Sequence, residues 1–549
     1  MPAKATNLRA LMMSRLVAFC CVVIALPALA RPPRLTVFIS VDALGTDVLQ
    51  KHRPRLKGGL ARLINEGAFV PSVHYEFAEC VTGAGHTPLV TGANPWRHGV
   101  VSNKIFNRAT GKLDPIFADA NHPILEAPIG NDDVSPANLL AETLSDRLRA
   151  STWSGGKSLA LSGKARSAIA MAGKLGEAWW FHEPLGRFVT GTYYRKAVPA
   201  WVQAFNDKKL PDGYHGKKWE LLGPVKEYRG EDERPFESDW YGMSRVFPHP
   251  LAGGLPSPGP QSYSALASSP MMNEVMVEFA KAAIEGEQLG KDDVPDLLSL
   301  SFSAFDRTYH LYGPSSWEMQ DMVLRLDKAL GDLLALLDRV VGRGNVVVIL
   351  SADHGGAGIP EEWAALGLDG KRVSPVSLST AVNDALKAKT GLEKTIVSIE
   401  ETDVYLDLKG LTDKKQDVMA VRRQVAEQLR ALPDVAVAVS RDDLEGRDTA
   451  GLLRALQLGF HPDRSGDVLM ILKPFRVLET EERGTSHGTP YSYDSEVPLF
   501  LWGRGVKPGI SAAHARVIDV APTAAALMEL GAPALSEGHA LNELLALPK

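Results

Sequence analysis

The sequence predicts an α/β protein with a mostly parallel central sheet that is flanked by helices on both faces. Two observations lead to this prediction. Short apolar, β-branched runs recur along the chain, and amphipathic helical patterns lie between them. In such sheets binding sites form at the carboxyl ends of the strands, so the polar residues that follow the apolar runs are the candidate functional residues.

Five apolar runs are the predicted strands. The first, residues 35–41 (LTVFISV), ends at Asp42. The other four are residues 159–162, 297–303, 346–350 and 497–502. Residues 319–341 carry leucines at helical spacing, and residues 517–530 form an amphipathic helix near the end of the chain. This alternation is typical of a sheet that is covered on both faces.

The composition sets broad limits on the class of protein. The chain has 549 residues, of which 45% are hydrophobic and 23% are charged, as in ordinary globular proteins. The net charge of −5 gives no reason to expect nucleic acid as a partner. Three cysteines exclude a disulfide scaffold and a cysteine-rich zinc module.

The first 30 residues are typical of a secretory signal peptide. A basic start is followed by an apolar run, residues 16–30, that ends in Ala28-Leu29-Ala30, the small residues that a signal peptidase needs. The alternative is a membrane anchor, but a span needs about 20 apolar residues and Pro27 interrupts this run. We therefore expect a mature chain of residues 31–549 that is periplasmic or secreted and has no stable membrane association.

Two stretches depart from the alternating pattern. Residues near 180–290 are rich in Trp, Tyr, Pro, Gly and charge, and residues near 360–475 carry helices and strands of their own. We interpret both as cap insertions in one catalytic domain that spans residues 31–549. No internal repeat is present.

Aspartate and histidine residues gather at or near the predicted strand ends. Asp42 follows the first strand, and Asp353 and His354 follow residues 346–350. Asp306 and His310 follow the strand that ends at 303, and their i, i+4 spacing would place them on one face of a helix. His487 lies in a glycine-rich loop. Each piece alone is more typical of a cap or a surface residue. Together they offer three carboxylates and three imidazoles, which suits two ions of zinc or a similar divalent metal.

Thr82 is the candidate nucleophile. It lies in the segment ECVTGAGHT, where glycines permit a close approach of the backbone. A hydroxyl is a weak nucleophile, but a metal can lower its pKa and generate an alkoxide at neutral pH. The alternative interpretation is that Thr82 only caps a helix.

The order of these motifs resembles the alkaline phosphatase superfamily, and more closely the phosphate-irrepressible bacterial alkaline phosphatases, which are exported monomers with a threonine nucleophile. The resemblance rests on Asp42, Thr82 in TGAGH, Asn103 in HGVVSN, Asp306 with His310, Asp353-His354-Gly355 and His487. It implies two zinc ions. One would be held by Asp306, His310 and His487, and the other by Asp42, Asp353, His354 and the Thr82 oxygen.

Asn103, Lys164 and Arg166 bear on the substrate class. The family uses an amide at the Asn103 position to hold a phosphoryl oxygen, and Lys164 and Arg166 resemble its Lys-x-Arg pair. A phosphate monoester carries two negative charges and a diester one, so two cations and an amide match a monoester. The alternative is that both cations are solvated surface charges. We expect a phosphomonoesterase that forms a covalent phosphothreonine and releases inorganic phosphate from small-molecule esters.

Other branches of the superfamily fit the residues less well. Sulfatases need a C/S-x-P-x-R motif, which the segment after Cys80 lacks. Nucleotide pyrophosphatase/phosphodiesterases share the nucleophile and the ligands and are the main alternative; the aromatic residues at 179–181 and 193–194 would then form an apolar ester pocket rather than core packing. A noncatalytic exported binding protein would be expected to lack Thr82 or a ligand, and none is missing.

Overall fold

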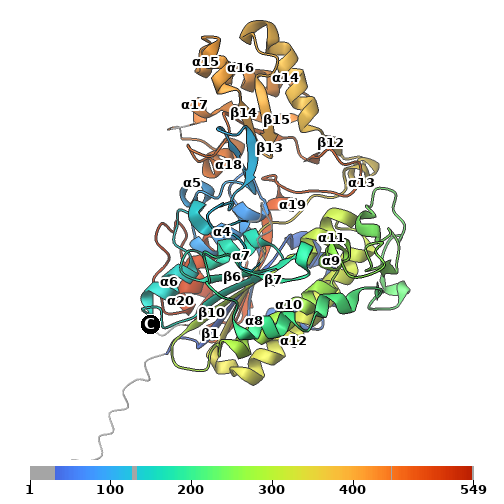
Figure 1. The fold of residues 1–549 in the computed structure, drawn as a ribbon, viewed down its shortest axis with the longest axis vertical. Helices are drawn as coiled ribbons and strands as arrows, with labels where there is room; N and C mark the ends of the chain where they lie inside the picture. Colours follow the sequence, from blue (N-terminus) through green and yellow to red (C-terminus); the bar gives the residue numbers. More distant parts are fainter. Residues whose placement is uncertain (1–30, 127–132, 445, 447, 547–549) are drawn as a thin grey trace, which may run out of the picture.

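One large sheet forms the centre of the molecule (Figure 1). The computed structural model describes residues 31–126, 133–444, 446 and 448–546. The predicted signal peptide, residues 1–30, lies outside the described residues. Within the described ranges, no helix combines the length and the apolar character that a membrane crossing requires.

The large sheet has ten strands and is mostly parallel, which confirms the predicted fold class. They are β1 (Leu35–Val41), β2 (Ala68–His74), β5 (Ser158–Ser162), β6 (Glu177–His182), β7 (Arg187–Val189), β10 (Asp296–Phe302), β11 (Val346–Ser351), β18 (Glu496–Gly503), β19 (Gly509–Ile510) and β20 (Ala515–Arg516). Their order is β19-β2-β18-β11-β1-β10-β5-β6-β7, with β20 beside β2. The central strands β11, β1, β10, β5 and β6 are parallel to one another.

Three pairs of neighbouring strands are antiparallel instead of parallel. Strand β18 runs antiparallel to both β11 and β2, and β7 runs antiparallel to β6. The five predicted strands differ from β1, β5, β10, β11 and β18 by no more than one residue at either end. The apolar run of β18 predicted a strand but did not encode its direction, because a strand buried on both faces has the same pattern in either direction.

Strand β1 lies at the middle of the sheet, between β10 and β11. Leu35 pairs with Asp296 on one side and with Val346 on the other, so the three strands are in register. All seven residues of β1 are buried, which is why its sequence is apolar almost throughout. Because the strands are parallel and in register, their carboxyl ends meet at one edge of the sheet.

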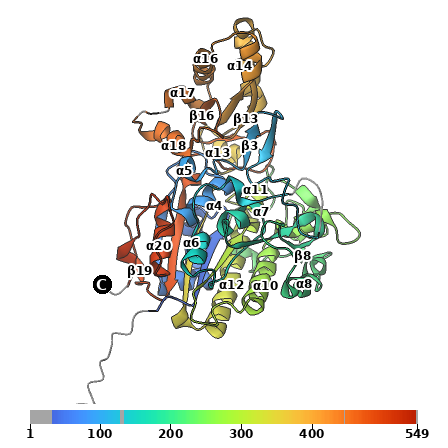
Figure 2. The same cartoon turned by 60° about the vertical axis from the view of Figure 1, so that its left-hand side comes forward.

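Two layers of helices cover this sheet (Figure 2). In one layer α4 (Thr82–Thr91), α6 (Leu144–Ser151), α7 (Ala165–Ala172) and α20 (Val520–Leu527) contact one another. In the other layer the long helix α12 (Trp317–Val340) contacts α3 (Gly59–Glu66), α10 (Met271–Gly286) and α11 (Ala304–Tyr312). The leucines that predicted α12 are buried along one side of it.

A second, four-stranded sheet stands apart from the large one, at the top of Figure 1. Its antiparallel order is β13 (Ile396–Glu400), β14 (Asp403–Leu406), β16 (Val468–Leu472) and β15 (Val435–Ser440), and it packs with α14 (Pro375–Thr390) and α16 (Val418–Ala431). These elements have an apolar core of their own, which includes Val404, Val425 and Met470. They lie in the stretch expected as the second insertion.

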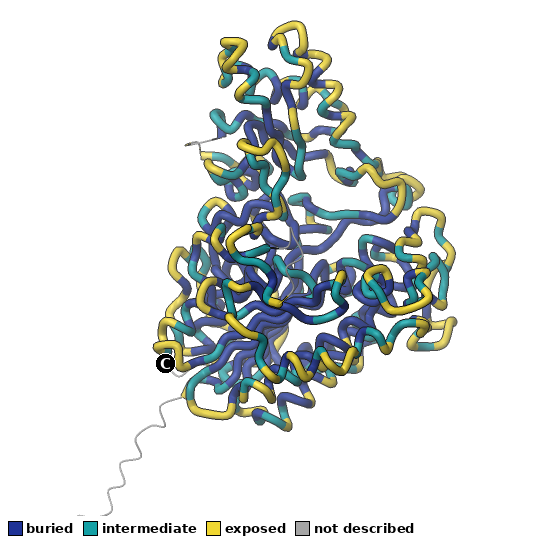
Figure 3. Tube along the Cα trace, in the orientation of Figure 1, coloured by how far each residue is buried: buried dark blue, intermediate teal, exposed yellow. Residues whose placement is uncertain are grey.

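Residues 180–290 belong to the main core. They include α8 (Ala200–Asn206), α9 (Pro260–Ala267) and the short pair β8 (Lys218–Trp219) and β9 (His249–Pro250). Several of their apolar side chains, such as Trp219, Met243 and Phe279, are buried in the same core as the large sheet. Figure 3 shows the buried strands at the centre and the exposed outer turns of the helices and of the small sheet.

Candidate active site and metal centre

The candidate site lies at the carboxyl edge of three neighbouring strands. Asp42 directly follows β1, Asp306 lies in the first turn of α11 after β10, and Asp353 and His354 follow β11. Thr82 is the first residue of α4. Because parallel strands end at the same edge, they bring together side chains that are far apart in the sequence.

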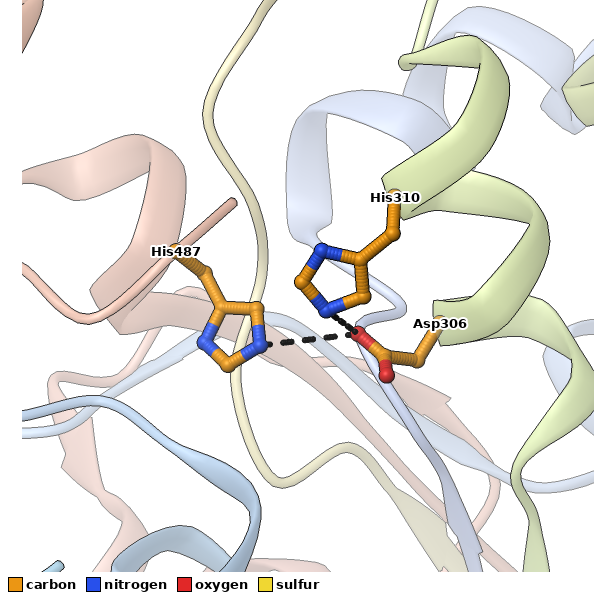
Figure 4. Close-up of side chains that lie close together, drawn as sticks. All are labelled: Asp306, His310 and His487. Atoms are coloured by element: carbon orange, nitrogen blue, oxygen red, sulfur yellow. Dashed lines mark ion pairs between the residues drawn. The ribbon is translucent and has the colours of Figure 1, made fainter. Parts of the chain in front are cut away.

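Asp306, His310 and His487 form what we term the first metal group (Figure 4). Their ligand atoms all lie within 4.8 Å of one another. Nε2 of His310 is 3.3 Å from Asp306 Oδ1, and Nε2 of His487 is 3.6 Å from the same oxygen. Helix α11 supplies the Asp306 and His310 side chains one turn apart, and the loop before α19 (Ser492–Ser495) supplies His487.

Asp42, Asp306 and His354 form the second metal group, again within 4.8 Å. Nε2 of His354 lies 3.3 Å from Asp42 Oδ1. Asp306 therefore belongs to both groups. Asp353, which we expected in this group, lies beside it with Oδ2 3.4 Å from His354 Nε2.

Backbone carbonyls orient all three imidazoles. Nδ1 of His310 lies 2.8 Å from the Thr485 carbonyl oxygen. The corresponding Nδ1 distances are 2.7 Å for His354 to the Gly355 oxygen and 2.9 Å for His487 to the Cys80 oxygen. A carbonyl only accepts, so each Nδ1 carries a hydrogen, and each Nε2 is the ring nitrogen that can coordinate a metal once it carries no proton.

Four buried polar atoms at this site have no hydrogen-bond partner among the described residues. They are Asp42 Oδ1, Asp306 Oδ1, Asp353 Oδ2 and His354 Nε2. His86 Nδ1 lies 2.9 Å from Asp353 Oδ2 and 3.0 Å from the Thr82 carbonyl oxygen. Its single hydrogen is donated to the carbonyl, so it does not satisfy Asp353 Oδ2. Buried polar atoms in proteins are nearly always satisfied, so this set of carboxylate and imidazole atoms fits divalent metal ions.

The charges around the two groups favour the deprotonated state of their carboxylates. Burial alone would raise the pKa of Asp306, but His310 and Lys164 outweigh it and hold that pKa well below its usual range. Burial opposes the charge on Asp42 in the same way, and the Lys164 ammonium, 2.7 Å from Oδ2, lowers its pKa below the usual value. Both carboxylates are therefore available to bind a cation.

The imidazoles respond differently to the same surroundings. Burial would lower the pKa of His354, but Asp353 and Asp42 raise it to about 10. Burial and the neighbouring His354 hold the pKa of His487 well below its ordinary value. His487 is thus neutral and ready to bind a metal, whereas His354 must release a proton first.

Thr82 does not cap α4, which was the alternative interpretation of this residue. The N-cap of α4 is Val81, and Thr82 is the first residue of the helix itself. The helix packs closely against the strand end, since a Cβ on Gly85 would lie 2.0 Å from the Asp353 carbonyl oxygen. A glycine at this position lets α4 bring Thr82 to the edge of the sheet.

Asn103, Lys164 and Arg166 line one cleft of about 330 Å³. The Gly83 amide donates to Asn103 Oδ1 at 2.8 Å, which leaves the Asn103 NH₂ group for another acceptor. Lys164 Nζ lies 2.7 Å from Asp42 Oδ2 and 2.5 Å from Asp306 Oδ2. Arg166 Nε is buried and has no partner among the described residues. An unpaired guanidinium nitrogen in a cleft is a suitable contact for an anion.

The sequence singled out neither His182 nor Arg307, which line the same cleft. His182 ends β6, so the rule that selected the other strand-end residues applies to it as well. Arg307 directly follows Asp306 and forms an ion pair with Glu183. Of the aromatic cluster, Trp180 and Phe181 line the cleft, whereas Trp179 is fully buried with its ring 6.1 Å from that of Trp201. Cys80 is buried, as is usual for a small apolar residue.

Comparisons with known proteins agree with this geometry. The family described as type I phosphodiesterase / nucleotide pyrophosphatase matches residues 36–492. The alkaline phosphatase PafA of Elizabethkingia meningoseptica is 31% identical over 93% of this chain and 94% of its own length. The alkaline phosphatase PhoV of Synechococcus elongatus is 31% identical over 94% of each chain. A crystal structure of wild-type PafA superposes with a TM-score of 0.89 over 94% of this chain and 99% of that one, at 31% identity.

Proposed function

The chain belongs to the type I phosphodiesterase / nucleotide pyrophosphatase family of the alkaline phosphatase superfamily, and from that premise we propose that it is an exported alkaline phosphatase. Its substrates would be small phosphate monoesters, and its product inorganic phosphate. Full-length similarity to proteins named alkaline phosphatases supports this proposal. The signal-like residues 1–30 support export, and we propose that the mature enzyme is a periplasmic or secreted monomer.

The observation that favours a monoester is the composition of the cleft. Lys164, Arg166 and Asn103 line it together, and Arg166 Nε has no partner there. A monoester dianion offers three charged oxygens, which two cations and an amide can contact at once. A diester offers only two such oxygens and one charge, so it would use this set only in part.

We assign two zinc ions to the site because their ligand types fit. Asp306, His310 and His487 would hold one ion, and Asp42, Asp353, His354 and the Thr82 oxygen would hold the other. When bound, zinc stabilises negative charge on oxygen and lowers the pKa of a coordinated hydroxyl or water. The unpartnered oxygens of Asp42, Asp306 and Asp353 support this assignment.

The proposed reaction has two displacement steps at phosphorus. In the first, Thr82 Oγ1 forms a bond to phosphorus while the bond to the ester oxygen breaks, which gives phosphothreonine and the alcohol. The Thr82 proton passes to solvent, and the departing alkoxide takes a proton from water. In the second, a water oxygen bonds to phosphorus while the bond to Thr82 Oγ1 breaks. One proton of that water ends on Thr82 Oγ1 through solvent, which restores the hydroxyl, and inorganic phosphate leaves.

Lys164 has a double role in this proposal. Its ammonium already contacts the Asp42 and Asp306 carboxylates, and it carries three N–H donors. It can therefore keep a carboxylate contact while it donates to a phosphoryl oxygen. Arg166 and the Asn103 amide would hold the other nonbridging oxygens.

The second candidate function is a diesterase of the nucleotide pyrophosphatase type. One observation favours it: Trp180 and Phe181 line the same cleft and offer an apolar surface to a second ester group. The family description covers diesterases as well.

A paired assay separates the two functions. kcat/KM is measured for p-nitrophenyl phosphate and for bis-p-nitrophenyl phosphate with the zinc-loaded mature protein, and both assays are repeated with a chelator. We expect a large preference for the monoester that is lost on chelation. A preference for the diester would instead assign the chain to the diesterase branch.

A further inference from the structure

Two glutamates are buried away from the candidate active site. Glu237 lies in the loop before the short 3-10 helix Trp240–Gly242, and Glu318 lies in the first turn of α12. Both side chains belong to residues with 0% exposed surface. Glutamate is almost never fully buried unless it is paired, so each needs a partner that accounts for its position.

Most of their carboxylate oxygens have no such partner. Neither oxygen of Glu237 accepts a hydrogen bond among the described residues, and Oε2 of Glu318 accepts none either. Only Glu318 Oε1 has a close neighbour, His249 Nε2 at 2.9 Å. Three buried oxygens are therefore unsatisfied, which is costly in the absence of a ligand.

Asp321, one turn further along α12, shows how the same fold satisfies a buried carboxylate. Its oxygens accept from Trp219 Nε1 at 2.7 Å, Leu222 N at 2.7 Å, Tyr228 OH at 2.5 Å and Arg325 Nε at 2.6 Å. Asp321 is also fully buried. This region of the fold can therefore supply donors to a buried carboxylate, but it does not supply them to Glu237 or to Glu318 Oε2.

Arg234 does not satisfy the Glu237 carboxylate. Arg234 Nη1 lies 3.9 Å from Glu237 Oε1, beyond hydrogen-bonding distance, and Arg234 is also paired with Glu362. Glu237 and Glu362 therefore share the single guanidinium of Arg234, while Glu318 pairs with the His249 imidazole.

The two glutamates lie within electrostatic reach of each other. Burial and then Glu318 are the largest influences on Glu237, and they raise its pKa to about 10. Burial, followed by Glu318 and Glu237, also raises the pKa of Tyr312 well above its ordinary value. Contacts also place both glutamates near the Tyr312 phenol. The Tyr312 ring lies 5.3 Å from the ring of His249, which contacts Glu318. Ser238 N, next to Glu237, donates to the carbonyl of Leu311, the residue before Tyr312.

We propose that Glu237 and Glu318 bind one hard divalent cation, Ca²⁺ or Mg²⁺, at a structural site that is separate from the two metal groups. Carboxylate oxygens are the ligands that these ions prefer, and backbone carbonyls and water complete their coordination in proteins. Zinc fits less well, because both ring nitrogens of His249 are already engaged, by the Met243 carbonyl and by Glu318.

The position of this site gives the cation a structural role. The residues on either side of Glu237 connect to both parts of the first metal group: Phe236 O accepts from Gly484 N at 2.7 Å, and Ser238 N donates to Leu311 O at 2.9 Å. Leu311 follows His310 on α11, and Gly484 lies three residues before His487 in the same loop. A cation at Glu237 would fix the segment that holds these two elements together.

The competing explanation is a proton. If Glu237 is simply neutral and shares a proton with Glu318, then Glu237→Gln replaces it with a side chain of the same shape and charge. That variant would keep or raise the melting temperature, whatever cation is present. If a cation binds, Glu237→Gln instead removes a ligand and the cation-dependent part of the stability.

The experiment uses the zinc-saturated mature protein after dialysis against buffer freed of other divalent ions. Equilibrium dialysis with ⁴⁵Ca²⁺, and a parallel Mg²⁺ arm read by elemental analysis, count the ions bound per chain; thermal melts give Tm with and without each ion. We expect one Ca²⁺ or Mg²⁺ per chain and a rise in Tm of about 2–4 °C.

Variants locate the bound ion. Glu237→Gln and Glu318→Gln should lose the bound ion and the Tm rise, whereas Glu278→Gln, at an exposed glutamate on α10, should keep both. Absence of Ca²⁺ and Mg²⁺ from the wild-type protein at millimolar concentrations would overturn the proposal, and so would an ion that Glu237→Gln retains. If a variant fails to fold, the wild-type count alone decides whether an ion binds. Both readouts are independent of phosphatase turnover.

Discussion

The two metal groups contain the same kinds of ligand but lie in different surroundings. In the second group Asp42 and His354 have side chains with 0% exposed surface. In the first group the His310 side chain is 33% exposed, although Asp306 and His487 are nearly buried. Ligands of the same chemistry therefore form one closed position and one that is open to solvent.

The difference follows from the elements that carry the ligands. Asp42 directly follows the central strand β1, and His354 lies three residues after the end of β11. The backbones of both strands are fixed by pairing on both sides. His310 and His487 lie on a helix and a loop at the rim. In the proposed function, the closed group would position Thr82, the proposed nucleophile, and the open group would face the leaving group and the incoming water. Substitutions at the two groups test this division.

The largest effect is expected at Thr82, on the side of the closed group. Thr82→Ala removes the proposed nucleophile without touching an imidazole or a carboxylate, so kcat/KM for a monoester should fall by at least about 10⁴-fold. Zinc content should stay at the wild-type value, measured by elemental analysis. Thr82→Ser should recover part of the rate. Retention of activity by Thr82→Ala would show that water attacks phosphorus directly.

Removing one histidine from each group compares the two positions directly. His354→Ala and His310→Ala should each lose one zinc ion and about 10³-fold in kcat/KM, because several kcal/mol of charge stabilisation is removed. Their stabilities should differ. His354→Ala removes the buried partner of Asp42 Oδ1, although Lys164 still contacts Oδ2, and should cost about 3 kcal/mol of unfolding free energy. Removing the partly exposed His310 imidazole should cost about 1 kcal/mol or less.

Two control variants match the exposure of the substituted histidines at positions outside both metal groups. His122→Ala removes an imidazole that is as exposed as His310, with 34% of the side chain accessible, from a position outside both groups. His98→Ala removes a fully buried imidazole that does not contact either group. Both should keep the wild-type zinc content. Equal stability losses for His354→Ala and His310→Ala would argue against a closed and an open position.

The sequence predicted the parts of the site that strand ends determine. Asp42, Asp353 and His354 follow apolar runs whose burial is evident from composition, and the i, i+4 spacing of Asp306 and His310 predicts one helix face. The bounds of the central strands were also predictable, because a strand covered on both faces is apolar throughout.

Long-range packing determines what could not be predicted from the sequence. No local pattern indicates that Asp306 lies within reach of both groups, or that Asp353 lies closer to His86 than to His354. The contact of Lys164 with two carboxylates depends on the register of β5 beside β10. Glu237 lies in a polar loop sequence that predicts exposure, and only the tertiary fold buries it.

Substitutions of Lys164 and Arg166 test the contacts with the substrate instead of those with the metal ions. Arg166→Ala and Lys164→Ala should each lower kcat/KM for a monoester by about 10²-fold and leave a diester nearly unaffected. Lys164→Ala should in addition change zinc affinity, because its ammonium contacts a carboxylate of each group. Arg339→Ala, at an exposed arginine on α12, is the control. Equal losses for the two substrates would exclude a role in binding the dianion.

The smallest effect concerns the pH dependence of stability in the metal-free protein. Although burial opposes it, Asp353 and Asp42 raise the pKa of His354 from 6.5 to about 10. A group whose pKa is higher in the folded state contributes stability that is fully present below 6.5 and is lost as pH rises through 10. Asp42 and Asp306 have lowered pKa values, so their contributions change only in acid.

The Tm of the metal-free protein should therefore fall by several degrees between pH 6.5 and 10. The Tm of the zinc-loaded protein should fall much less, because a His354 that binds zinc is already deprotonated. Thermal melts across this range, with and without zinc, give the two curves. His354→Ala without metal should lack most of this loss. Burial opposes charge on His310 too, but Asp306 raises its pKa, so His310→Ala should also reduce the loss, by a smaller amount. Parallel curves for the metal-free and the zinc-loaded wild-type protein would mean that zinc does not bind His354, and that the closed group is an ion-paired cluster rather than a metal position.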